Sequence, residues 1–187
     1  MKTAICKLRS ESPYSQSKHY TVDRLPKELH EDYEERTWRE RCNIDNDGNI
    51  MIPPMAFSNS LKEAAKYLNI SIPGGGKRTF TKHFEAGVMV VEGVTLNKKK
   101  EDVEGEWVFV PSDGRRGGTT RVLKCFPKIK EWSGIVKYLI FDDIITPEVF
   151  EQVIKASGAF IGVGRFRPRN CGYYGRFLVE GIKWQNQ

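Results

Sequence analysis

Residues 146–184 read TPEVFEQVIKASGAFIGVGRFRPRNCGYYGRFLVEGIKW, and this stretch decides the fold. Thr146-Pro147-Glu148 is a good helix start, because threonine caps free backbone N–H groups and proline fits the first helical turn. Apolar residues at helical spacing follow, up to an expected stop at Gly158. The last strand is expected over Gly175–Trp184. The segment therefore predicts a helix, a glycine-rich loop and a strand in succession.

Upstream of this segment the chain alternates between helix and strand patterns. Pro26 introduces a charged helical stretch that runs to about Arg41. A second helix is expected over Ser58–Leu68, with Ser58 as its N-cap. The other expected strands are Thr3–Arg9, Val88–Leu96, Glu106–Pro111, Arg121–Lys130 and Ile135–Phe141.

This succession of elements predicts the fold class. With a middle lobe set aside, the order is strand, helix, strand, strand, helix, strand, which is the split βαβ pattern of ferredoxin-like and RNA-recognition folds. We therefore predict a single α+β domain over residues 1–187. Its core would be ferredoxin-like or RRM-like (βαββαβ), with a basic lobe inserted at approximately 70–118, and its open sheet face would be a platform for single strands.

Charge favours a polyanionic partner. The 187 residues carry a net charge of +6, and from Ala159 to Gln187 there are five basic residues against one acidic residue. From Asp23 to Cys42, by contrast, seven acids outnumber five bases. The four cysteines are widely spaced and require no disulfides, and no segment reaches the roughly 20 apolar residues of a membrane span. A cytoplasmic location is expected.

The glycine-rich loop carries the candidate nucleic-acid site. Arginine binds phosphate in a bidentate way, aromatic rings stack on unpaired bases, and glycine lets the backbone approach a ligand closely. If residues 165–169 are extended, their three alternating arginines share one face. The loop residues expected to bind nucleic acid are Arg165, Arg167, Arg169, Tyr173, Tyr174 and Arg176. A loop whose glycines serve only turns is the alternative.

Five basic residues of the middle lobe are expected to close over the same strand. They are Lys77, Arg78, Lys82, Arg115 and Arg116. Glycines 74–76 precede Lys77, but the phosphate-loop motif requires Ser or Thr directly after its lysine, where this chain has Arg78. A mobile basic loop that touches phosphate is therefore favoured over an NTPase.

Other motifs point away from catalysis. The turn at residues 45–48 lacks the spacing of a calcium loop, and neither the histidines nor the cysteines have the spacing of metal ligands. A general-base role remains open for His19 or His83. We predict no catalytic residue, no metal and no cofactor.

The last third of the chain resembles the RAMP superfamily, the ferredoxin-like RNA-binding proteins of CRISPR complexes. Gly162-Val163-Gly164-Arg165, followed by Gly172-Tyr173-Tyr174-Gly175-Arg176-Phe177, occupies the place of that family's glycine-rich loop between the last helix and the last strand. Residues 52–62 also look like the proline-then-helix segment of CRISPR backbone subunits. The chain is smaller than most of those subunits and lacks their usual glycines in the proline segment. It looks like compact proteins of phages and other mobile elements, which would place it in a bacterial host cell.

Three functions follow from the residues and the resemblance. The first is non-catalytic binding of single-stranded RNA or DNA, with self-assembly along the strand or membership of a CRISPR-type protein complex implied by the resemblance. The second is an RNA-processing ribonuclease, as some RAMP relatives are. The third is a phage inhibitor that imitates a CRISPR subunit.

Overall fold

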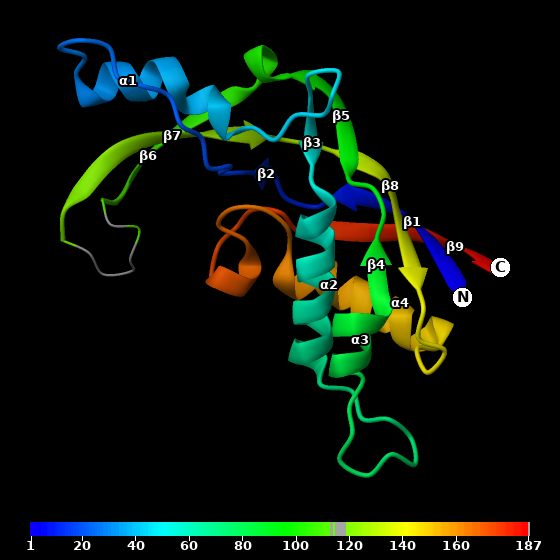
Figure 1. Ribbon diagram of the computed structural model, residues 1–187. Helices are drawn as coiled ribbons and strands as arrows, with labels where there is room; N and C mark the ends of the chain where they lie inside the picture. The colour runs from blue at the N-terminus through cyan, green and yellow to red at the C-terminus, as the bar shows by residue number, and fades with distance from the viewer. Residues whose placement is uncertain (113, 115–118, 187) are drawn as a thin grey trace.

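The computed structural model describes residues 1–112, 114 and 119–186, and it has the mixed α/β composition with antiparallel sheets that the sequence predicts (Figure 1). A four-stranded sheet forms the centre, in the order β4 (Val88–Val90), β8 (Ser133–Ile140), β1 (Lys2–Ser10) and β9 (Phe177–Asn186). Every neighbouring pair in it is antiparallel.

Burial alternates along the central strand β1. Ala4, Cys6 and Leu8 are fully buried, whereas Lys7 and Arg9 are exposed. Successive side chains of a strand point to opposite faces, so one face of the sheet meets the core and the other remains open. Helices α2 (Pro54–Leu68) and α4 (Pro147–Ala156) cover the buried face.

Helix α2 begins four residues earlier than the sequence predicts. Pro54 occupies its first turn, and Ser58 is buried inside the helix, so the expectation that Ser58 is the N-cap is wrong. The reason is that Pro53 has extended backbone and Pro54 has the fixed φ that suits a first helical turn. Phe57, Leu61 and Ala64 form the buried stripe. In the described part of the chain, no helix is long and apolar enough to cross a membrane.

Helix α4 begins as predicted, but helical backbone continues past the expected stop. The Thr146 hydroxyl accepts a hydrogen bond from the Val149 N–H at 3.4 Å. A single π-helical turn, Ser157–Ile161, continues the helix past the expected stop at Gly158, and the chain turns away at Gly162, where φ is +73°. Gly158 serves packing instead, since a Cβ there would lie 2.0 Å from the Phe177 carbonyl oxygen.

A second antiparallel sheet lies beside the first, in the order β2 (Tyr14–Ser15), β7 (Arg121–Ile129) and β6 (Glu104–Pro111). Strands β3 (Asn49–Ile52) and β5 (Val94–Lys99) form a separate pair. The single strand expected over Val88–Leu96 is therefore wrong, because residues 91–93 separate β4 in the main sheet from β5 in this pair. The shorter elements are α3 (Thr81–Gly87) and the 3₁₀ turns Trp38–Arg41, Lys100–Asp102 and Pro168–Asn170.

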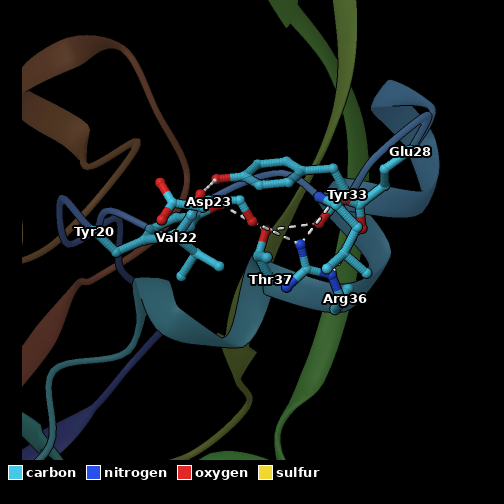
Figure 2. A network of polar contacts seen from close by, with 8 residues as sticks. Tyr20, Val22, Asp23, Glu28, Tyr33, Arg36 and Thr37 are labelled. Carbon is cyan, nitrogen blue, oxygen red and sulfur yellow. Dashed lines mark hydrogen bonds and ion pairs between the residues drawn. The ribbon is translucent and has the colours of Figure 1, made fainter.

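Helix α1 (His30–Thr37) is held against the segment that precedes it by polar contacts (Figure 2). The Tyr33 hydroxyl donates to the Val22 carbonyl oxygen at 2.9 Å, and Arg36 donates to the Asp23 carbonyl oxygen and to Glu28. The hydrogen bond from Arg36 is the main cause that lowers the pKa of Glu28, to about 2. These contacts fix helix α1 on residues 22–28.

Candidate functional site

A groove of about 690 Å³ lies between strand β6 and residues 162–176, which we call the glycine-rich loop. Figure 1 shows β6 and β7 curving away from the main sheet, with the loop (orange) beside helix α2. Both walls carry aromatic and polar side chains. The groove is lined by Glu106, Val108, Phe109, Val110, Pro111, Gly114, Arg121, Arg165, Phe166, Asn170 and Tyr174.

Close backbone packing shapes the glycine-rich loop. A Cβ on Gly175 would lie 1.8 Å from the Val163 carbonyl oxygen, and a Cβ on Gly172 would lie 1.8 Å from that of Phe166. The loop also docks on the β2 segment, where the Arg165 N–H donates to the Ser15 carbonyl oxygen at 2.7 Å. These two glycines therefore allow the close backbone packing that gives the loop a defined shape.

Arg165 lies at the centre of the groove wall. Its guanidinium stacks on the Phe126 ring, with the Cζ atom 3.5 Å from the ring centroid. Its Nη1 atom is buried and has no hydrogen-bond partner among the described residues. Burial lowers the pKa of Arg165, and Glu106 opposes this shift. Arg165 thus lines the groove with a half-buried guanidinium, in a partly desolvated place where an anionic oxygen would be bound strongly.

Aromatic rings flank Arg165 along the groove. Phe109 of β6 and Phe166 of the loop are 66% and 52% exposed, which leaves ring surface free for stacking. Tyr174 is nearly buried, and its hydroxyl donates to Glu106 across the groove floor. Tyr173 is 63% exposed and packs edge-on against the Tyr174 ring.

The other arginines of the glycine-rich loop have internal partners. Arg167 forms an ion pair with Glu63 of α2 at 2.8 Å, and Arg169 lies 3.8 Å from the same carboxylate. Arg176 donates to the Ala159 carbonyl oxygen at 2.8 Å. The expected extended stretch with three arginines on one face is wrong, because Phe166 has a φ of +52° and a 3₁₀ turn follows at 168–170.

Three of the basic residues expected from the middle lobe, Lys77, Arg78 and Lys82, do not line the groove. Lys77, Arg78 and Lys82 are exposed in and after the loop that joins α2 to α3, beyond the C-terminal end of α2 (Figure 1). Arg115 and Arg116 lie outside the described residues. In their place the groove has Arg121, which is exposed at the start of β7 and which the sequence did not single out.

Two further cavities extend the groove past Arg165. One of about 340 Å³ is lined by Arg165, Phe126, Arg41 and Lys124, and it shares Arg41 and Lys124 with another of about 390 Å³. The far cavity is lined by His19 and His30, together with Lys18 and Tyr33. No spacing in the sequence indicates that His19 and His30 line one cavity, because this depends on the tertiary structure of the segment between them.

Buried charge supports this wall of the groove. Glu34 and Arg41 are 2% and 6% exposed and form an ion pair at 2.7 Å. The Glu34 carboxylate also accepts from the Cys125 N–H at 2.8 Å, and Arg41 donates to the Cys125 carbonyl oxygen at 3.1 Å. The pair therefore fastens the α1 segment to β7. Within the described residues, no group of His, Cys, Asp and Glu side chains could hold a metal ion.

Comparisons with known proteins give a structural likeness but no family. No family model matches the chain, and no curated protein matches it. The chain is similar to a solved structure described as the crystal structure of Cmr6 from Pyrococcus furiosus, with 14% sequence identity and a TM-score of 0.47. The similarity covers 96% of this chain and 99% of that one. At this TM-score and identity, the likeness identifies neither a family nor a function.

Proposed function

We propose that this protein binds single-stranded nucleic acid in the groove between β6 and the glycine-rich loop, without cleaving it. One observation carries the proposal: a half-buried arginine, Arg165, stacks on Phe126 and lines the groove together with exposed aromatic rings. Phosphate would accept from Arg165 and Arg121, and bases would stack on Phe109 and Phe166. The exposed rings of Phe109 and Phe166 favour unpaired bases over a duplex, because stacking requires a free base face.

We propose further that the core is ferredoxin-like and that the protein is RAMP-like. The strand order β4-β8-β1-β9, with α2 and α4 on one face, supports the first part. The position of the glycine-rich loop between α4 and β9 supports the second. On this proposal the chain is a single domain, and the parts of residues 70–118 on either side of β4 elaborate it, because β4 itself belongs to the main sheet. The protein would act in a CRISPR-type complex with RNA or assemble along a strand.

A titration tests the binding proposal directly. A labelled single-stranded oligonucleotide should bind more tightly than a duplex of equal length, because stacking requires unpaired bases. Affinity should fall by on the order of a thousandfold between low and physiological salt if several phosphates are contacted, since each contact releases counterions. Fluorescence anisotropy at several salt concentrations measures both effects. Equal affinity for the two forms, or a flat salt response, would exclude this binding mode.

A ribonuclease is the second candidate function, and one observation favours it. His19 and His30 line the same cavity, which is joined to the groove by cavities that share Arg41 and Arg165. One imidazole could take the proton of an RNA 2′-hydroxyl as it attacks phosphorus, while the other protonates the departing 5′-oxygen. This chemistry would need no metal.

RNA integrity distinguishes the two candidates. On the binding proposal, labelled RNA incubated with the protein in EDTA should stay intact over hours. Gel electrophoresis of the products measures this. Bands that disappear both in His19→Ala and in His30→Ala would establish the ribonuclease instead, and bands that persist in both variants would indicate a contaminating nuclease.

A further inference from the structure

The open face of the main sheet is a second surface with chemistry of its own. Its side chains alternate with the buried ones, so the register of the four strands identifies them. Ile135, Met89 and Leu178 are 63%, 47% and 40% exposed there. The described basic residues on this face are Lys7, Arg9, Lys137 and Lys183.

The charge of this face is positive and mostly uncompensated. Glu180 is its acidic residue among the described positions of the four strands, and it forms ion pairs with both Lys7 and Arg9, at 3.0 and 2.9 Å. The exposed Lys137 and Lys183 flank Ile5 on the neighbouring strands, where Ile5 pairs with each of them in register. Cations therefore alternate with aliphatic residues across the sheet.

The composition of the face argues against nucleic acid. Single strands are held by rings that stack on bases, and the described outward positions of β1, β4, β8 and β9 carry no aromatic residue. The aromatic residue Trp184 pairs with Ala4 on the buried side, where it packs against Phe150. Phe141, one residue past the end of β8, is 51% exposed, but within the described positions of the four strands the expected platform for single strands has no stacking group. Exposed aliphatic side chains are what protein interfaces bury.

A cavity of about 470 Å³ adjoins the end of this face. Arg9 and Ser133 of the sheet line it together with Asn97 and Lys98 of β5, and Glu131 also lines it. Arg9 is already paired with Glu180, so Lys98 and the Asn97 amide are the groups that would receive a carboxylate side chain in this concave place. The cavity thus offers an anchor point for an acidic group at the margin of an aliphatic surface.

We propose that the open face binds another protein through a segment that combines acidic and aliphatic residues. Aliphatic side chains of the partner would cover Ile135, Met89 and Leu178. Its carboxylates would meet Lys137 and Lys183, with one more in the cavity beside Arg9 and Lys98. Charge complementarity selects an acidic partner, because a basic segment would bring like charges together at each of these positions. The groove and the open face share no described residue, so both partners could bind at once.

A random linear peptide library displayed on phage, selected against the full-length protein, tests this proposal. Enriched peptides should contain Asp or Glu together with Leu, Ile or Val. When synthesised, they should bind Lys137→Glu and Ile135→Ser about tenfold or more weakly, since charge reversal or removal of the aliphatic side chain disrupts part of the interface. Lys66→Glu, the same charge change on the exposed surface of α2, should bind them like the wild type.

Three outcomes would overturn the proposal. The library could yield no binder, or the enriched peptides could bind Lys137→Glu and Ile135→Ser with full affinity. Alternatively, Lys137→Glu could weaken binding of a labelled single-stranded oligonucleotide while Lys66→Glu does not, which would make the open face a nucleic-acid surface. The two proposals can fail separately. If the open face binds protein, Lys137→Glu and Ile135→Ser should bind an oligonucleotide as the wild type does, whatever the affinity of the groove.

Discussion

Replacing Arg165 and Arg121 together with alanine should weaken binding of a single-stranded oligonucleotide by on the order of a hundredfold. Each hydrogen bond to a charged group contributes about 1.5–3 kcal/mol, and these two arginines line the groove among the residues that the structure describes. The slope of log affinity against log salt should also become shallower, by about 0.7 for each phosphate that the variant no longer binds. Anisotropy titrations of both proteins measure the two quantities.

Control variants separate the groove from general charge. Lys66→Ala combined with Lys155→Ala removes the same net charge from the exposed surfaces of α2 and α4, and it should bind like the wild type. Thermal melting of the double arginine variant checks its folding, because Arg165 also packs on Phe126. A folded double arginine variant with wild-type affinity would show that this groove is not the site.

The largest effect on stability is expected at the buried ion pair under the groove wall. Glu34→Gln keeps the shape of the side chain but leaves the Arg41 guanidinium buried without its carboxylate partner. Breaking such a pair costs about 3–5 kcal/mol. At about 2–4 °C per kcal/mol for a chain of this length, the melting temperature should fall by roughly 10 °C. Differential scanning calorimetry measures the change.

The neighbouring residue supplies the matched control. Glu35 is on the exposed side of α1, and Glu35→Gln makes the same chemical change without a buried partner. Its effect on the free energy of unfolding should stay within about 0.5 kcal/mol. If the two variants melt together, the Glu34–Arg41 pair does not hold the α1 segment on β7 in the way its burial implies.

Local signals in the sequence were enough to predict where several helices and strands around the site begin. Thr146 and Pro147 predicted the start of α4, and alternation predicted β1. The end of α4 was missed because Gly158 is needed for close approach to the Phe177 backbone rather than for a stop. The break between β4 and β5 was missed for a similar reason, since a Cβ on Gly93 would lie 2.1 Å from the Ile52 carbonyl oxygen.

The groove itself could be predicted only in part. The glycine-rich loop supplied Arg165 and Tyr174, but its opposite wall comes from β6, which is distant in sequence and carries no motif. In the sequence, Arg167 looked as well suited to phosphate binding as Arg165. The structure shows that Arg167 already forms an ion pair with Glu63. Partner choice among similar arginines depends on tertiary contacts that no local pattern encodes.

Cysteine reactivity offers a direct test of where the strand lies. Cys171 is exposed in the glycine-rich loop, next to a groove residue, whereas the other three cysteines are buried. Burial raises the pKa of Cys6 to about 12 and the pKa values of Cys42 and Cys125 to about 11, so these thiols stay protonated and unreactive near neutral pH. In the folded protein, alkylation should therefore report on Cys171.

The central claim is that a single strand occupies the groove beside this loop. The measurement is the rate of iodoacetamide modification of Cys171, followed by mass spectrometry, with and without a saturating single-stranded oligonucleotide. The claim predicts that the bound strand slows modification severalfold and that a duplex of equal length protects less. An oligonucleotide that binds tightly, as shown by anisotropy, yet leaves the Cys171 rate unchanged would contradict it.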